Sequence, residues 1–118
     1  MSTQFSCPTA AEVFALLGNR RRLLVVRYLS LFSCGQTVSV RHVARVICGI
    51  ETNTPPSQVT STAYESVYNG LIQNHLPRMH EHGLIQYDER GKEIGVLTDV
   101  FYYAYLVSLV SLPRTLHQ

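Results

Sequence analysis

Between Tyr64 and Met79 the apolar residues recur three or four positions apart, which is the spacing of one face of an α-helix. The stripe consists of Val67, Tyr68, Leu71, Ile72, Leu76 and Met79, with His75 among them. Gly83 follows as a helix stop, because glycine accepts the left-handed conformation that commonly ends a helix. Two short β-like runs, 84–87 and 94–97, then flank a turn-like stretch at 89–92. The pattern predicts an amphipathic helix followed by a two-stranded hairpin.

Start and stop signals predict three further helices and a strand upstream of this unit. A side-chain oxygen at the residue before a helix can accept a hydrogen bond from the first-turn amides, and such residues recur here. The predicted helices are a short one that Thr9 caps and that runs through Leu17, residues 20 to about 32 with Asn19 as the cap, and residues 40 to about 49 with Ser39 as the cap. Residues 37–38 are expected to add a short strand to the hairpin.

Residues 51–62 form the clearest loop of the chain. Pro55 and Pro56 prevent a helix from continuing, and polar residues surround them. The amphipathic helix is expected to begin near Ser61 or Thr62, with Glu65 as the capping-box acid for Thr62. Pro77 should kink this helix or start its last turn.

A helix that leads into a hairpin with a basic tip is the layout of a winged helix-turn-helix, whose recognition helix enters the DNA major groove. The expected fold class is mainly α with a small β-hairpin: a winged helix-turn-helix plus a C-terminal dimerisation helix. With 118 residues, the chain is long enough for one such domain. We expect a flexible arm at 1–8, the winged helix-turn-helix domain at 9–98, and an apolar helix and tail at 99–118.

The C-terminal helix is apolar on nearly every side from Val100 to Leu112, where Pro113 ends it. At 13 residues this run is too short to span a bilayer, which needs roughly 20 residues. One face can pack on the domain, and the remainder is expected to pair with a second copy in a two-fold homodimer. The alternatives are a helix buried wholly in its own domain and, less favoured, one lying on a membrane surface. The expected dimer interface comprises Phe101, Tyr102, Tyr105, Leu106 and Leu109.

Charge and side-chain chemistry indicate a polyanionic partner. Residues 1–50 hold six Arg and one Glu, whereas residues 51–118 hold four basic and seven acidic residues. The polar face of the recognition helix carries small and amide side chains, and Asn and Gln can pair bidentately with adenine. The expected base contacts are Ser66, Asn69, Gln73 and Asn74. The expected contacts to the DNA backbone are Arg20, Arg21, Arg22, Arg41, Arg78, Arg90 and Lys92.

The alternative interpretation is that these arginines are solvated surface charges without a binding role. For Arg41 and its neighbour Arg45, this alternative is about as good as contact with the DNA backbone. For residues 20–22, we do not expect all three side chains to face phosphates at once.

The remaining residues indicate neither a catalytic nor a metal site. Cys7, Cys34 and Cys48 are odd in number and form no C-x-x-C pair, which favours a reducing compartment over a disulfide framework or a zinc site. His80 and His82 point to different faces of a helix and would chelate a metal poorly. No nucleotide-binding glycine loop or nucleophile motif is present, and the N-terminus lacks the pattern of a secretory signal. We therefore expect a cytoplasmic protein that is not an enzyme and has no cofactor.

Several stretches resemble a family of small haloarchaeal winged-helix transcription regulators of poorly defined function. The resemblance covers about residues 12–98, and it is carried by residues 16–22, 38–44 and above all 74–88. The specific part is the string H-L-P-R-M-H-E-H-G-L-I-Q-Y-D at 75–88. More distantly, His75-Leu76 followed by Gly83-Leu84-Ile85 is similar to the end of the recognition helix in arsenic-repressor-like regulators. The resemblance implies an archaeal DNA-binding protein that is often dimeric, and it supplies neither an operator nor a small-molecule effector.

Together these observations predict a sequence-specific regulator of transcription that binds double-stranded DNA as a homodimer and represses by occlusion. The alternative is a winged-helix module that binds protein and no longer binds DNA. The acids that flank the hairpin tip, Asp88, Glu89 and Glu93, keep this alternative open.

Overall fold

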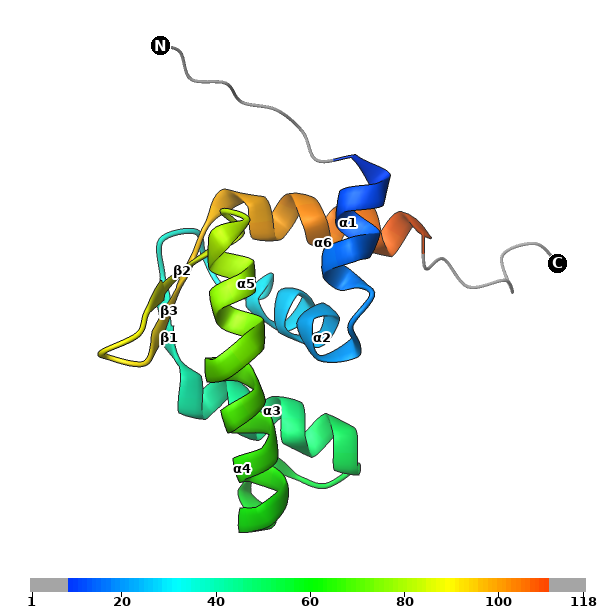
Figure 1. The fold of residues 1–118 in the computed structure, drawn as a ribbon. Helices are drawn as coiled ribbons and strands as arrows, with labels where there is room; N and C mark the ends of the chain where they lie inside the picture. The colour runs from blue at the N-terminus through cyan, green and yellow to red at the C-terminus, as the bar shows by residue number, and fades with distance from the viewer. Residues whose placement is uncertain (1–8, 111–118) are drawn as a thin grey trace, which may run out of the picture.

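The structure, a computed structural model, describes residues 9–110, and it is mainly helical with a small antiparallel sheet (Figure 1). Along the chain the elements are α1 (Ala10–Leu17), α2 (Arg20–Leu29), β1 (Thr37–Ser39), α3 (Val40–Thr52), η1 (Pro56–Gln58), α4 (Ser61–Gly70), η2 (Leu71–His75), α5 (Leu76–Glu81), β2 (Ile85–Asp88), β3 (Glu93–Val96) and α6 (Thr98–Val110). The arrangement is compatible with a winged-helix fold. The expected arm at 1–8 and the end of the tail at 111–118 lie outside the described residues.

The three strands form one sheet in the order β1-β3-β2, with both pairs antiparallel. Thr37 lies opposite Gly95, which in turn lies opposite Gln86. This confirms the prediction that residues 37–38 extend the hairpin. The turn between β2 and β3 is closed by Asp88, whose Oδ1 accepts the backbone N–H groups of Arg90 and Gly91 at 3.1 Å each. We call this turn, residues 89–92, the wing tip.

Most of the predicted helix signals are confirmed. Thr9 and Glu12 form a reciprocal capping box at α1, and Asn19 and Ser39 cap α2 and α3. Gly83 has φ +73°, and the Leu84 N–H donates to the Met79 carbonyl, a 6→1 bond that closes the last turn of α5. The expected cap of α4 was wrong, because Thr60 rather than Thr62 accepts the N–H of Ala63.

Two helix ends also differ from the prediction. The second helix stops at Leu29, short of the expected residue 32, whereas α3 continues to Thr52, where Asn53 caps it in the left-handed region at φ 56°. Asn tolerates this conformation better than most residues other than glycine. The loop that follows is therefore shorter than the expected stretch at 51–62.

The helix expected to read DNA is continuous from α4 through η2 to α5, and η2 is a π-helical turn. Within it the N–H of Leu76 donates to the carbonyl of Leu71, five residues back, and both side chains are fully buried. The wide turn places side chains five apart on the same face. It also accommodates Pro77, which has no N–H to donate and whose ring would crowd the carbonyl of Gln73 in a regular α-helix. Pro77 therefore lies where the helix changes from π to α, at the start of α5.

One hydrophobic core joins all of these elements except η1, and α6 belongs to it. Val100, Tyr103 and Val107 of α6 are buried, and the helix packs against α2. Tyr105 and Leu109, on another face of the same helix, are 60% and 49% exposed. This exposure excludes the alternative in which the C-terminal helix is buried wholly within its own domain. In Figure 1, α6 crosses the upper end of the domain and α4 projects at the lower end.

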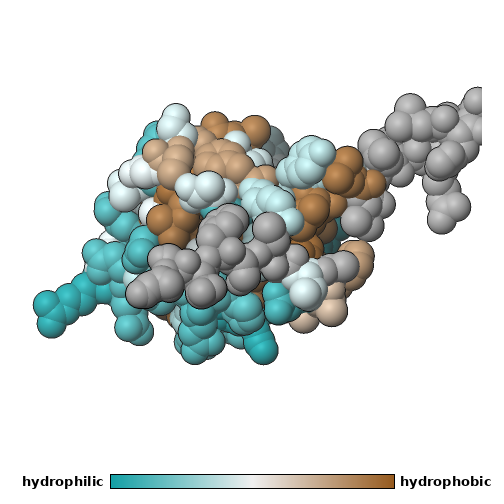
Figure 2. All heavy atoms as spheres, turned by 90° about the horizontal axis from the view of Figure 1, so that it is seen from above, coloured by the Kyte–Doolittle hydropathy of each residue, from teal (hydrophilic) through white to brown (hydrophobic). Residues whose placement is uncertain are grey.

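The surface at the α6 end is mixed. Figure 2 views the molecule from this end and shows hydrophobic patches beside a broad hydrophilic area. Among residues 9–110, no helix combines the length and the apolar character needed to traverse a bilayer.

Candidate nucleic-acid interface

The polar face of α4 and η2 is exposed, as the amphipathic pattern predicts. Ser66 and Asn69 lie on α4, Gln73 and Asn74 lie on η2, and all four side chains are open to solvent. Within residues 9–110, none of the four makes a side-chain hydrogen bond or ion pair. Their donors and acceptors are consequently available to an external partner.

A seam of aromatic and basic side chains runs along one side of this face, between α4 and α3. Tyr64 and Tyr68 stack with ring centroids 5.7 Å apart, and the guanidinium carbon of Arg45 lies 5.1 Å from the Tyr64 centroid. Burial and the neighbouring Tyr68 raise the pKa of Tyr64, although Arg41 and Arg45 act in the opposite direction. The sequence predicts both tyrosines on the apolar stripe, whereas the structure leaves them half-buried at its edge.

The seam continues to the wing through an open hollow of about 290 Å³. Its lining residues come from β1, α3, α4 and the wing tip: Ser39, Arg41, Tyr68, Gly91 and Lys92. Arg41 is exposed, whereas Lys92 is half-buried and its Nζ donates to the Glu89 carbonyl at 2.6 Å. This contact holds the lysine side chain against the backbone of the wing tip. Arg41 and Lys92 thus line one hollow with Tyr68 of α4.

The three consecutive arginines at the start of α2 have three different environments. Arg20 is exposed. Arg21 makes a bidentate ion pair with Glu51: Nε lies 2.6 Å from Oε2, and Nη2 lies 3.0 Å from Oε1. The hydrogen bond to Glu51 raises the pKa of Arg21. Arg22 is only 8% exposed and donates from Nε to the Leu16 carbonyl at 2.5 Å.

The guanidinium of Arg22 is therefore buried inside the domain and not presented to a DNA phosphate, unlike what the sequence leads us to expect. Arg21 is partly exposed, and two of its three guanidinium nitrogens are already paired with Glu51. The remaining expected backbone contacts, Arg78 on α5 and Arg90 at the wing tip, are exposed.

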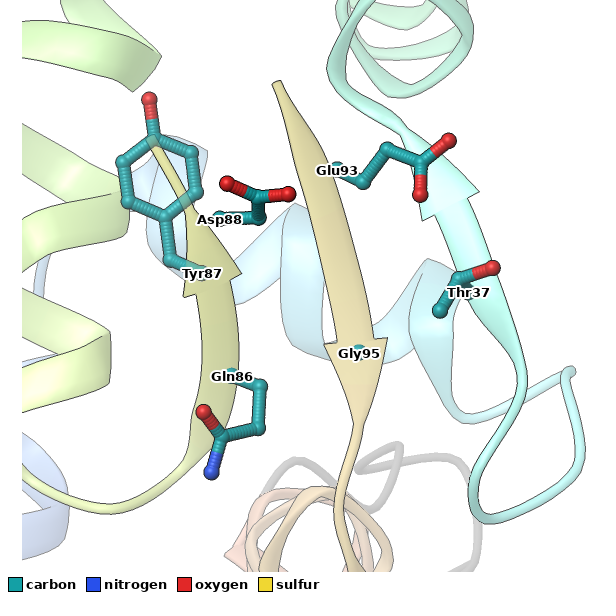
Figure 3. Close-up of a pocket in the computed structure, with 6 residues that line it drawn as sticks. All are labelled: Thr37, Gln86, Tyr87, Asp88, Glu93 and Gly95. Atoms are coloured by element: carbon teal, nitrogen blue, oxygen red, sulfur yellow. The ribbon is translucent and has the colours of Figure 1, made fainter. Parts of the chain in front are cut away.

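The outer face of the sheet has the opposite character. Thr37, Gln86 and Gly95 lie side by side across the three strands and floor an open hollow of about 210 Å³ (Figure 3). Asp88 and Glu93, which pair across β2 and β3, bring two carboxylates to the same hollow. This face is unsuited to a polyanion, because like charges repel.

Tyr87 also borders this hollow, and its ring lies beside β2 toward the helix drawn in green in Figure 3. Its hydroxyl is buried without a hydrogen-bond partner among the described residues, and burial raises its pKa. Among residues 9–110, no group of three or more His, Cys, Asp or Glu side chains is placed to hold a metal ion.

The geometry defines a class of protein before any comparison: a small helical domain that presents an exposed polar helix face, which also carries the carboxylate of Glu65, between basic side chains of α3 and the wing. Residues 14–95, more than half of the chain, match the family described as Domain of unknown function (DUF7344), and the chain belongs to this family. No curated protein and no solved structure matches the chain.

Proposed function

We propose that the protein is a sequence-specific regulator of transcription that binds double-stranded DNA as a homodimer of winged helix-turn-helix domains. The observation that carries the proposal is the unpaired polar face of α4 and η2, flanked by Arg41 and Arg45. Uncharged amides and hydroxyls read base edges, whereas arginine and lysine hold phosphates and fix the register on the duplex. The resemblance to haloarchaeal regulators supports the same function and an archaeal source.

The position of α6 supports a dimer in which both recognition helices stay accessible. The apolar residues Tyr105 and Leu109 are exposed on α6, at the end of the domain away from α4 (Figure 1). Phe101, Tyr102 and Leu106 are half-buried and would complete the interface. Pairing of two such helices would leave two copies of α4 to address half-sites about one turn of DNA apart, and occupancy of such a site would repress by exclusion.

The first test is binding of the purified protein to random-sequence duplex DNA across a salt series. We expect the logarithm of the binding constant to fall linearly with the logarithm of the salt concentration, because each phosphate contact releases about 0.9 of a counterion. Arg41→Gln should reduce the slope by about 1. Arg27→Gln is the matched control, since it removes the same charge from an exposed position on α2 and should leave the slope unchanged.

The second test separates base reading from phosphate binding. On a selected site, Gln73→Ala should cost about 1–3 kcal/mol of discrimination at one base pair and little on random DNA. An equal loss on both DNAs would remove the role proposed for Gln73. A folded protein that binds no duplex even at low salt would favour the protein-interaction module instead.

A further inference from the structure

The buried Arg22 makes a specific contact with the recognition helix. Arg22 Nη1 lies 3.2 Å from His75 Nδ1, and the two side chains are 8% and 6% exposed. The other side of the guanidinium is fixed, because Nε donates to the carbonyl of Leu16 at the end of α1. His75 is the last residue of η2. The pair therefore joins the α1–α2 corner to the π-helical turn.

This contact requires a neutral histidine. An arginine side chain has donors and no acceptor, so His75 Nδ1 must supply a lone pair and its ring proton must sit on Nε2. Protonation would make both partners donors and place two positive charges about 3 Å apart in a buried site. The hydrogen bond would then become a repulsion.

The surroundings do not compensate for a second positive charge. Four charged groups act on His75: Arg22 and Arg21 from α2, Arg78 from α5, and Glu51 from α3. Three are cations, and the carboxylate of Glu51 is already paired with Arg21. Burial, followed by these arginines, lowers the pKa of His75 below its ordinary value.

The same turn displays two of the residues assigned to base reading. Gln73 and Asn74 directly precede His75 and face solvent, whereas Leu71 and Leu76 on either side are fully buried. A π turn differs from an α turn by about one residue of register. The direction in which Gln73 and Asn74 project therefore depends on the turn keeping its π form, which the inward anchor at His75 supports.

We propose that Arg22 is a positioning residue: through neutral His75 it holds the π-helical turn in the register that presents Gln73 and Asn74 to DNA, and protonation of His75 releases this turn. The inference rests on the proposed function for its consequence, which is that discrimination between DNA sequences falls on acidification while binding to random DNA persists. The coupling between His75 and the turn is a property of the free protein and can be measured without DNA.

The experiment has one arm without DNA and one with it. In the first, the amide chemical shifts of Gln73 and Asn74 in the full chain are followed by NMR from about pH 8 to about pH 5, the range in which histidines titrate. We expect both to follow one titration with a midpoint below about 6.5, the ordinary histidine value. His75→Asn, whose side-chain oxygen can accept from Arg22 and which cannot be protonated, should abolish the titration.

A matched control comes from the same region. His82 is exposed and its Nδ1 contacts the Arg78 carbonyl at 2.9 Å, so His82→Asn removes a nearby imidazole ring without touching Arg22. It should leave the titration of Gln73 and Asn74 intact. Arg22→Gln keeps a donor and removes the charge, and it should raise the midpoint. Flat shifts in the wild type, or a titration that persists in His75→Asn, would overturn the coupling.

In the second arm, the ratio of affinities for a selected site and for random duplex is measured across the same pH range. We expect the ratio to fall about tenfold or more in the wild type, with less than about a twofold change in His75→Asn. A titrating turn with an unchanged ratio would overturn the role of the switch in DNA reading. A titrating turn in a protein that binds no duplex would instead refute the proposed function and leave the coupling in place.

Discussion

Two glycines in the helices of the site provide a controlled test of the packing. Both Gly49 in α3 and Gly70 in α4 have helical neighbours on each side, so alanine should gain about 0.8–1 kcal/mol of helix propensity at either position. The surroundings differ. A Cβ at position 49 would lie 2.7 Å from the Thr54 carbonyl oxygen, which is backbone, whereas a Cβ at position 70 would lie 3.1 Å from Arg21 Nη1, the end of a long side chain.

Whether each substitution stabilises or destabilises the protein depends on whether the atoms near the new Cβ can move away. At position 49 the carbonyl belongs to the turn after α3, in which Thr54 N–H also donates to Gly49 O at 2.9 Å, so relief requires a backbone shift. Overpacking of this kind costs about 1–3 kcal/mol, which outweighs the propensity gain and leaves Gly49→Ala destabilised by up to about 2 kcal/mol. At position 70 the guanidinium can move by a few tenths of an ångström. The most it can lose is the Arg21–Glu51 pair, worth about 0.2–1 kcal/mol near the surface.

We therefore expect Gly70→Ala to be neutral or stabilised by up to about 1 kcal/mol, and Gly49→Ala to be the less stable of the two. Urea unfolding of both variants measures the difference, with unchanged m-values showing that the unfolded state is not responsible. Equal stabilities would refute the close approach of α3 to residues 54–56. A strongly destabilised Gly70→Ala would show that Arg21 is held rigidly over the recognition helix.

Two further predictions concern the same helix. Thr60→Ala should lower the free energy of unfolding by about 1 kcal/mol because it removes the cap of α4, whereas Thr62→Ala, two residues later, should change it by less than about 0.5 kcal/mol. Thermal unfolding of the two variants distinguishes the assignments, and the reverse order would restore Thr62 as the cap. Leu71→Ala, at a fully buried position beside the π turn, should cost about 2–5 kcal/mol in urea unfolding, and a loss below about 1 kcal/mol would mean that the site is not packed as described.

The local features of the fold follow from the sequence because they depend on neighbouring residues. Asn19, Ser39 and Gly83 act on amides and carbonyls within a few positions, and their roles are confirmed. The short strand at 37–38 is also confirmed, since its register with β3 satisfies a row of backbone groups. The cap of α4 was misplaced by two residues because Thr60 and Thr62 have the same chemistry, and the capping-box pattern at Thr62 and Glu65 favoured the wrong one.

The π-helical turn could not be read from the periodicity. Spacings of three and four fit a regular helix through His75, and the extra residue shows only in the hydrogen bond from Leu76 to Leu71. Pro77 is the one signal that the helix must adjust, and it specifies neither a kink nor a π turn. Which form results depends on the burial of side chains contributed by other elements.

The three arginines at 20–22 show why basic residues counted along a sequence overstate a DNA interface. Successive residues of a helix point about 100° apart, so three in a row cannot face one surface, and the chain geometry alone limits how many can bind phosphate. Which of them is free is decided by Glu51 and His75, which lie 30 and 53 positions away from their partners. Because Arg21 is paired and Arg22 is buried, two of the seven expected backbone contacts are less accessible to a phosphate than the sequence indicates. Each lost phosphate contact lowers the salt dependence of binding. The proposed interface would therefore have fewer phosphate contacts than a count of basic residues implies, and its selectivity would depend more on the amides of α4 and η2.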